Sequence, residues 1–355
     1  MVRCTADDSI SRRSIGSFEF PLGVYPVEPM TPKEGYTSEF EHADTGDGDT
    51  GIEVEPWPDR YVYDIVIRAN RMPALWFQIL ALMPSRVFPI LDYIGHDAYR
   101  EIDPYIAYEP VGVERIITLT KRFKDFFFED GMVGFGGVSE SPFFYAFVDE
   151  HKILTVRVEP ELCDRVERVL GAFGLSQIDD PSGADAAAHE HRSVLLIPED
   201  QPELLGPDEI LDIARDSWRL ILNVDPDSNL DDAGEDLGIT PWRCLVRRET
   251  DEETARVAEV VCTASCLREA ESLSMGGVDA LIREGDGHRD EEEETVEASE
   301  LVLLRADRVA PEDISVVREG EQDDKSFPDK FLERSTILAS RWLDTPQSGA
   351  DDTAD

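Results

Sequence analysis

The chain has 355 residues, 41% of them hydrophobic, and its 77 acidic residues outnumber 34 basic ones to give a formal charge of -43. Nucleic acids and anionic membranes are bound by Lys and Arg side chains that replace counterions, so this charge argues against both partners. The length allows two domains, each with a core of its own.

The acid excess has two interpretations. An acidic surface poor in lysine is typical of proteins adapted to high salt, where ions screen the self-repulsion of the fold. A docking surface for a basic partner protein is the alternative, but the acids are spread along the chain instead of being gathered in one tail. The odd number of five cysteines predicts a reducing, cytoplasmic environment without a disulfide framework.

The first segment, residues 1–56, is rich in Pro, Gly, Thr and acidic side chains and shows no sustained period. Such a composition predicts a segment that is disordered or extended over the surface. Two α+β domains are predicted after it, over residues 57–200 and 201–344, and residues 345–355 are predicted to be a disordered tail.

Ordered structure is expected to begin at RYVYDIVIRAN, residues 60–70, because its apolar residues alternate with polar ones as in a half-buried strand. Residues 72–95, MPALWFQILALMPSRVFPILDYIG, are predicted to be an apolar helix of a soluble domain. The uninterrupted apolar part covers only about a dozen residues, whereas a membrane-spanning helix needs ~20.

A second helix is predicted over residues 113–128, where apolar residues recur every three or four positions, with Gly131 ending it in a left-handed turn. Strands are predicted at 143–148 and 153–158, joined by a polar link of hairpin length. The clearest helix in the chain follows at 159–175, with a proline in its first turn and a glycine at its end.

The stretch GMVGFGGV, residues 131–138, resembles a phosphate-binding loop in its glycine content. A phosphate loop follows a strand and opens a helix, whereas these glycines follow a predicted helix and lead into a strand. We therefore predict a strand whose bare face, at Gly134 and Gly136, accepts the ring of Phe144 or Tyr145 from the next strand.

Together these elements predict an α+β fold in two domains: a mainly antiparallel sheet with helices packed on one face, after a disordered acidic N-terminal segment. A short strand at 193–197 either completes the first sheet or begins the second. For the second half we predict a helix at 207–224, a hairpin of 242–248 with 255–262, a helix at 266–275, a strand at 300–304 and a helix at 327–343 opened by Ser326 and Asp329.

The most specific polar pattern is DPDSNLDDAGED, residues 225–236. Five oxygen-bearing residues fall at the ligand positions of a calcium loop: Asp225, Asp227, Asn229, Asp231 and Asp236. Leu230 stands where such a loop has glycine, and the last ligand is an aspartate in place of the longer glutamate. The alternative is a short turn of helix with an asparagine cap. Calcium is the one cofactor that the sequence suggests.

Three cysteines could contribute to a zinc site. Cys262 and Cys266 could share one helical face, with Cys244 across the predicted hairpin and His288 downstream. Zinc sites usually combine two paired clusters, and only one pair exists here. We therefore expect these cysteines to be small buried hydrophobes.

Histidines offer two further candidates. His189 and His191 have metal-like spacing if their segment is extended, but they lie in an Ala- and Asp-rich stretch that we expect to be a solvated linker. His151, with Asp149 and Glu150 beside it, could transfer protons, although the tips of hairpins are commonly this polar.

The sequence contains no Gly-x-Ser-x-Gly elbow, no His-Glu-x-x-His pair and no Gly-Lys-Ser/Thr phosphate loop. We therefore predict an acidic, intracellular, non-catalytic module that binds a protein or a small ligand. One alternative is a hydrolase or transferase whose active residues come together only in three dimensions. A second alternative is a calcium-responsive module built on residues 225–236.

Overall fold

The computed structural model describes residues 3–43, 57–197, 201, 203–248, 256–285, 301–314 and 332–343. The chain divides into two compact units. Unit 1 comprises Met1–Ile94 and Ile102–Asn223, and unit 2 comprises Gly95–Glu101 and Val224–Asp355. The predicted boundary between residues 200 and 201 falls inside unit 1, because the helix and strand that follow it pack on the unit 1 core.

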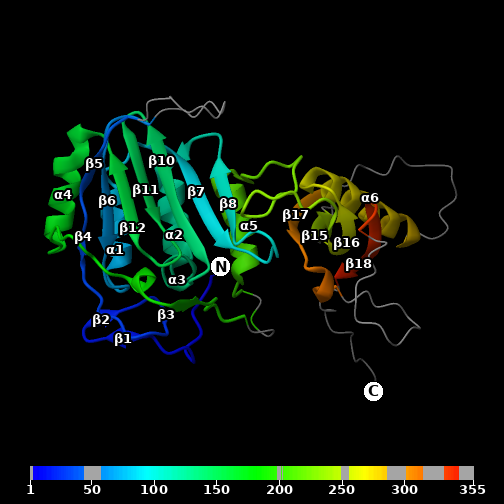
Figure 1. Ribbon diagram of the computed structural model, residues 1–355, viewed down its shortest axis with the longest axis horizontal. Helices are drawn as coiled ribbons and strands as arrows, with labels where there is room; N and C mark the ends of the chain where they lie inside the picture. Colours follow the sequence, from blue (N-terminus) through cyan, green and yellow to red (C-terminus); the bar gives the residue numbers. More distant parts are fainter. Residues whose placement is uncertain are drawn as a thin grey trace, which may run out of the picture. The chain divides into compact units, whose positions relative to one another are not determined.

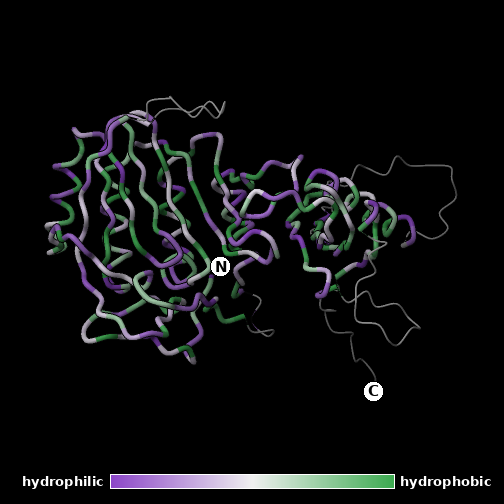
Figure 2. The backbone as a smooth tube through the Cα atoms, in the orientation of Figure 1, coloured by the Kyte–Doolittle hydropathy of each residue, from purple (hydrophilic) through white to green (hydrophobic). Residues whose placement is uncertain are grey.

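Unit 1 is built on a ten-stranded antiparallel sheet with the order β14-β8-β7-β10-β11-β12-β6-β4, in which β5 also pairs with β6 and β9 with β7. Its strands are β4 (Gly35–Tyr36), β5 (Glu39–Glu41), β6 (Arg60–Val66), β7 (Arg86–Ile94), β8 (Ile102–Ala107), β9 (Val111–Gly112), β10 (Val133–Glu140), β11 (Phe143–Val148), β12 (Leu154–Val158) and β14 (Leu220–Leu222). Hydrophobic segments, green in Figure 2, run along the central strands.

Five helices cover one face of this sheet, and Figure 1 shows α1, α2 and α3 behind the strands. They are α1 (Met72–Leu80), α2 (Val113–Arg122), α3 (Lys124–Glu129), α4 (Cys163–Ala172) and α5 (Pro207–Trp218). Their buried side chains join those of the strands in one core, where Phe127 contacts both Phe135 and Trp218. Mixed helices and antiparallel sheets confirm the predicted α+β class.

The apolar stretch 72–95 is not one helix, as the sequence suggested. Helix α1 ends at Leu80, and β7 begins at Arg86 and pairs with both β8 and β10. Side chains of β7 alternate between buried and partly exposed, which is the period of a strand. No helix within the described residues is long and apolar enough to cross a membrane.

The glycine-rich stretch forms β10, directly after α3 and between β7 and β11, so the predicted order of helix and then strand is confirmed. The ring that covers the bare face is Phe147 and not Phe144 or Tyr145. A Cβ atom at Gly134 would lie 2.8 Å from Cζ of Phe147, and one at Gly136 would lie 2.8 Å from Cδ2 of Phe147 and 2.2 Å from the carbonyl oxygen of Ala146. Glycine is therefore needed here for side-chain packing between strands.

The helix predicted over residues 113–128 is observed as α2 and α3, separated by Phe123, whose backbone leaves the helical region. Gly131 follows α3 without the left-handed backbone that we expected. Helix α4 is observed where it was predicted, and Gly174 after it has a φ of 67°, which suits the end of a helix.

Residues 3–43 extend along unit 1 as short strands (Figure 1). Of the two predictions for this segment, disordered or extended over the surface, the extended one describes these residues. They form β1 (Ser14–Ile15), β2 (Phe18–Glu19) and β3 (Val24–Pro26) besides β4 and β5, and β3 pairs with β13 (His189–His191). Residues 193–197 join neither sheet, and Leu195 makes an isolated bridge to Ala6. The predictions of disorder for 44–56 and 345–355 lie outside the described residues.

Unit 2 is a four-stranded antiparallel sheet, ordered β17-β15-β16-β18, with α6 on one face. Its elements are β15 (Thr240–Arg248), β16 (Arg256–Ala264), α6 (Leu267–Gly285), β17 (Leu301–Arg308) and β18 (Thr336–Leu343). The predicted hairpin, helix and following strand are all observed. The last predicted helix is wrong, because residues 336–343 are an edge strand paired with β16. Its expected capping residues, Ser326 and Asp329, lie outside the described residues.

Candidate metal site

Three imidazole rings meet at one point in unit 1. His151 lies in the link between β11 and β12, and His189 and His191 lie on β13. The Nε2 atom of His189 is 2.9 Å from Nε2 of His151 and 3.1 Å from Nε2 of His191. All three ring centroids are 4.7 to 4.9 Å apart, and the ring planes cross at 73° to 78°. We call these residues the histidine trio.

Strand pairing explains why two members of the trio point the same way. Residues on alternate positions of a strand face the same side, so pairing of β13 with β3 orients His189 and His191 together. Backbone hydrogen bonds fix the next residue, Arg192, to Gly23 and Gly131 at 2.8 and 3.1 Å. The expected solvated linker is therefore a strand whose two histidines are partly buried.

Each Nδ1 atom of the trio has a hydrogen-bond acceptor. His189 Nδ1 is 2.7 Å from the carbonyl oxygen of Ala187, and His191 Nδ1 is 2.8 Å from that of Gly131. His151 Nδ1 faces Asp149 at 3.3 Å, and a Glu150 oxygen lies 3.4 Å away. These acceptors assign the proton of each neutral ring to Nδ1, so three Nε2 lone pairs face one another. A metal ion bound by all three atoms relieves that repulsion, and so does protonation of one ring, whose Nε2–H then donates to a neighbouring Nε2.

The pKa values of His151 and His191 are shifted in opposite directions. Burial alone would lower the pKa of His151, but the hydrogen bond to Asp149 and the charges of Asp149, Glu150 and Asp185 raise it overall. Burial lowers the pKa of His191, in spite of its bond to the Gly131 carbonyl. The trio thus combines a ring backed by carboxylates with a ring that stays neutral more readily, and neutral imidazole is the form that binds metal.

Two buried charged residues, Lys152 and Asp130, lie near the trio and are held by hydrogen bonds. Burial lowers the pKa of Lys152 to about 8, against the opposing charges of Asp130, Asp149 and Glu150. The Lys152 ammonium donates to the carbonyl oxygen of Val133. Asp130 accepts hydrogen bonds of 2.9 Å from the backbone N–H groups of Met132 and Val194 and from Ser193 Oγ, while burial raises its pKa. These contacts hold the hairpin and the segment after β13 to the end of α3.

Among the described residues, no three of the predicted calcium ligands Asp225, Asp227, Asp231 and Asp236 have carboxylate oxygens within 4.8 Å of one another. Their carboxylate oxygens instead accept hydrogen bonds from nearby donors: Asp225 from Asp227 N–H, Asp227 from Arg268, Asp231 from Ala233 and Glu235 N–H, and Asp236 from Gly238 N–H. Among the described His, Cys, Asp and Glu residues, the groups of three that could hold a metal are the trio and Asp149 with Glu150 and His151.

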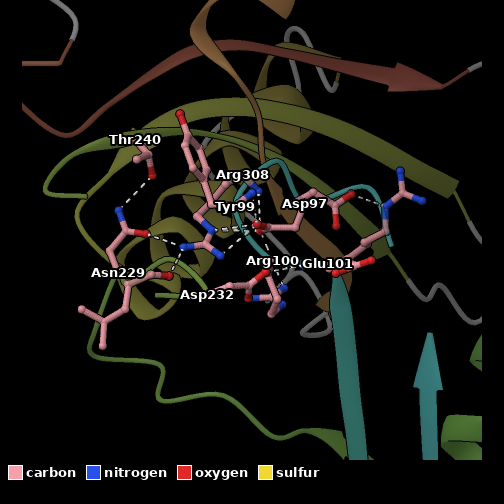
Figure 3. Close-up of polar contacts among 11 residues, drawn as sticks. Asp97, Tyr99, Arg100, Glu101, Asn229, Asp232, Thr240 and Arg308 are labelled. Carbon is pink, nitrogen blue, oxygen red and sulfur yellow. Dashed lines mark hydrogen bonds and ion pairs between the residues drawn. The ribbon is translucent and has the colours of Figure 1, made fainter. Parts of the chain in front are cut away.

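Asn229, the central residue of the predicted calcium loop, is a buried structural residue. Figure 3 shows its side chain between Thr240 and Arg308. Its amide donates to the Gly238 carbonyl at 2.7 Å and to Thr240 Oγ1 at 3.0 Å, and its oxygen accepts from Arg308 at 3.2 Å. Both amide N–H groups are thus used within unit 2, and the side-chain oxygen is held by a buried guanidinium.

The cysteines are free thiols without a metal-like arrangement among the described residues. Cys244 and Cys262 are buried in the core of unit 2 between the sheet and α6, as expected for small hydrophobes. Cys262 lies on β16 and Cys266 lies after it, before α6, so the two do not share a helical face. His288 lies outside the described residues.

No family model matches the chain, and neither the curated proteins nor the solved structures compared with it contain a match. The histidine trio is the strongest candidate site. Three Nε2 atoms lie close together, and the Nδ1 atom of each ring faces a hydrogen-bond acceptor.

Proposed function

We propose that unit 1 binds a divalent transition metal ion, Zn²⁺ in the first instance, through the Nε2 atoms of His151, His189 and His191. The observation that carries the proposal is the convergence of three Nε2 atoms, on rings whose Nδ1 atoms each face a hydrogen-bond acceptor. Metal-binding histidines usually donate their second N–H to a carbonyl or carboxylate in this manner.

The distances within the trio suit a zinc ion. Zn–N bonds of 2.0–2.1 Å in a tetrahedral arrangement place neighbouring nitrogens roughly 3.3 Å apart. The observed separations of 2.9 and 3.1 Å need only a small outward movement of the rings. Zinc, copper, nickel and iron accept imidazole, whereas calcium prefers oxygen, so the calcium-responsive alternative is not the one that this geometry favours.

Surrounding charge also favours a cation. Asp149 and Glu150 lie behind His151, and the charge of Asp185 also acts on that ring. Neutral imidazoles leave the positive charge of a divalent ion uncompensated, and these carboxylates supply the compensation. A metal ion is thus the small ligand of the binding module that the sequence predicts.

Metal titration tests the proposal. We expect the chelator-treated full chain to bind one equivalent of Zn²⁺ or Co²⁺ in isothermal calorimetry, and His189→Ala to lower the affinity at least 100-fold, because two ligands remain. Zinc at 100 times Kd stabilises the native protein by about 2.7 kcal/mol, so the melting temperature of the wild type rises on adding zinc and that of the variant does not.

His42→Ala is the matched control, because the His42 side chain is 86% exposed and lies outside the trio. It should bind zinc like the wild type. Equal zinc affinity in the wild type and in the triple variant of His151, His189 and His191 would refute the site. A calcium titration of the same sample should give no saturable heat, and heat abolished by Asp225→Ala would restore the calcium interpretation.

We further propose that the chain works in a cytoplasm of high salt. The formal charge of -43 and the five free cysteines support this. Salt that screens acidic self-repulsion stabilises the folded state, so we expect the melting temperature to rise steadily between low and multimolar KCl. A melting temperature that is flat or falls with KCl would contradict the proposal.

A further inference from the structure

The trio supplies three ligands, and the described part of the chain offers no fourth of the same kinds. Within the described residues, no further His, Cys, Asp or Glu brings a ligand atom within 4.8 Å of all three Nε2 atoms. Structural zinc sites are closed by four protein ligands, whereas catalytic sites keep a position for water and substrate. The donor count therefore points to a metal ion with an exchangeable position.

The carboxylates near the trio lie on the wrong side of His151 to fill that position. Asp149 and Glu150 face Nδ1 of the ring, at 3.3 and 3.4 Å, while the metal-directed atom is Nε2. Asp149 is also held by the backbone N–H of Ile153 at 2.7 Å. This is the carboxylate, histidine and metal arrangement in which the acid orients the ring, so Asp149 is a positioning residue.

The trio is partly exposed to solvent. Each of its residues is only partly buried, and the side chain of His151 is 18% exposed. The acids around it, Asp149, Glu150 and Asp185, would repel a phosphate or carboxylate group on an incoming molecule. An uncharged acyl compound meets no such barrier.

Resting on the proposed metal site, we propose that the trio is a hydrolytic centre for uncharged carboxylic esters. A zinc ion held by the Nε2 atoms of His151, His189 and His191 would supply a bound water with a pKa of about 7, which could lose a proton to solvent. Such a hydroxide would attack the carbonyl carbon, and the bond from that carbon to the alcohol oxygen would break. The alcohol leaves after taking a proton from solvent, so one ester and one water give one acid and one alcohol.

The test uses the zinc-loaded full chain and two chromogenic probes, neutral p-nitrophenyl acetate and anionic p-nitrophenyl phosphate. We expect metal-dependent hydrolysis of the acetate, at least tenfold above both the chelator-treated protein and free zinc, and no comparable hydrolysis of the phosphate. His191→Ala should lose this activity, and His42→Ala should keep it. Asp149→Asn should keep one bound zinc and the same KM but lower kcat about 10-fold or more.

The outcomes separate the two proposals. Protein that binds zinc at the trio without accelerating acetate hydrolysis overturns the hydrolytic centre and leaves the metal site standing. Protein that binds no zinc overturns both. Faster hydrolysis of the phosphate than of the acetate overturns the inferred substrate class, and an unchanged kcat in Asp149→Asn overturns the positioning role.

Discussion

Replacing Arg308 with methionine is expected to destabilise unit 2 by up to about 3–5 kcal/mol, because the buried carboxylate of Asp97 then keeps only Arg100, at 3.7 Å, as a charged partner. The two side chains are 3% and 0% exposed, and their closest atoms are 2.8 Å apart. Arg308 also donates to Asn229 and to the Leu230 carbonyl (Figure 3). Its loss therefore removes the partner of several groups that water cannot reach.

Amide hydrogen exchange measures the loss of stability in unit 2 separately from the stability of unit 1. Protection should fall across β15 and β17 and at Ala98 and Tyr99, whose N–H groups bond to the Arg308 carbonyl and to Asp97. Arg268→Met is the matched control, because Arg268 pairs with Asp227 while both side chains are 63% exposed, and it should change little. Equal protection in the two variants would show that the buried pair is not needed.

A double variant separates the pair from the packing around it. Asp97→Leu combined with Arg308→Met removes both charges, so it should recover part of the stability lost in Arg308→Met alone. A double variant that is as unstable as the sum of the single variants would mean that the hydrogen bonds to Asn229 and Leu230 carry the effect.

Strands with one buried face were the elements that the sequence predicted best. Along β12 buried side chains alternate with partly exposed ones throughout, and the same alternation is visible in its residues. In β15 and β16 burial alternates over part of the strand, whereas β6 and β11 are buried at most positions on both faces. Where the apolar run continues through a loop, as between α1 and β7, hydropathy cannot place the boundary. Pro84 interrupts the run there, and the two neighbouring strands recruit the second part into the sheet.

The last strand shows why a helix was predicted in its place. Leu338 and Trp342 are four residues apart, a spacing that places two side chains on one face of a helix and also on one face of a strand. In β18 both are partly buried, and partly buried residues alternate with exposed ones along the whole strand. Backbone pairing with the edge of β16 makes this segment a strand, and a local sequence pattern does not reveal such pairing.

The candidate site was half visible in the sequence. His189 and His191 have the right spacing, but their segment becomes a strand only by pairing with β3, in a region expected to lack structure. His151 lies 38 residues before His189, with α4 between them, so no local motif links them. Asn229 was singled out by its position in the calcium-loop pattern, but in the structure its buried side chain forms hydrogen bonds within unit 2.

Gly131→Ala is expected to destabilise unit 1 by about 3 kcal/mol, at the upper end of the cost of overpacking. A Cβ atom at Gly131 would lie 2.1 Å from the carbonyl oxygen of Gly23 and 3.2 Å from the backbone nitrogen of Arg192. These are backbone atoms held in place by hydrogen bonds, Gly131 to Arg192 and Arg192 to Gly23, so they cannot rotate away as a side chain could. Relief requires the three segments to separate.

Separation of these segments also reaches the histidine trio, because the Gly131 carbonyl accepts from His191 Nδ1 and Arg192 follows His191 directly. We therefore expect Gly131→Ala to lower zinc affinity at least tenfold as well as the midpoint of urea unfolding. Gly171→Ala is the control: no atom lies within 4 Å of its added Cβ, and alanine in α4 should stabilise the helix by up to about 1 kcal/mol. Wild-type stability in Gly131→Ala would mean that the contact between Gly23 and Gly131 is looser than the structure places it, and wild-type zinc binding in a destabilised variant would separate this contact from the site.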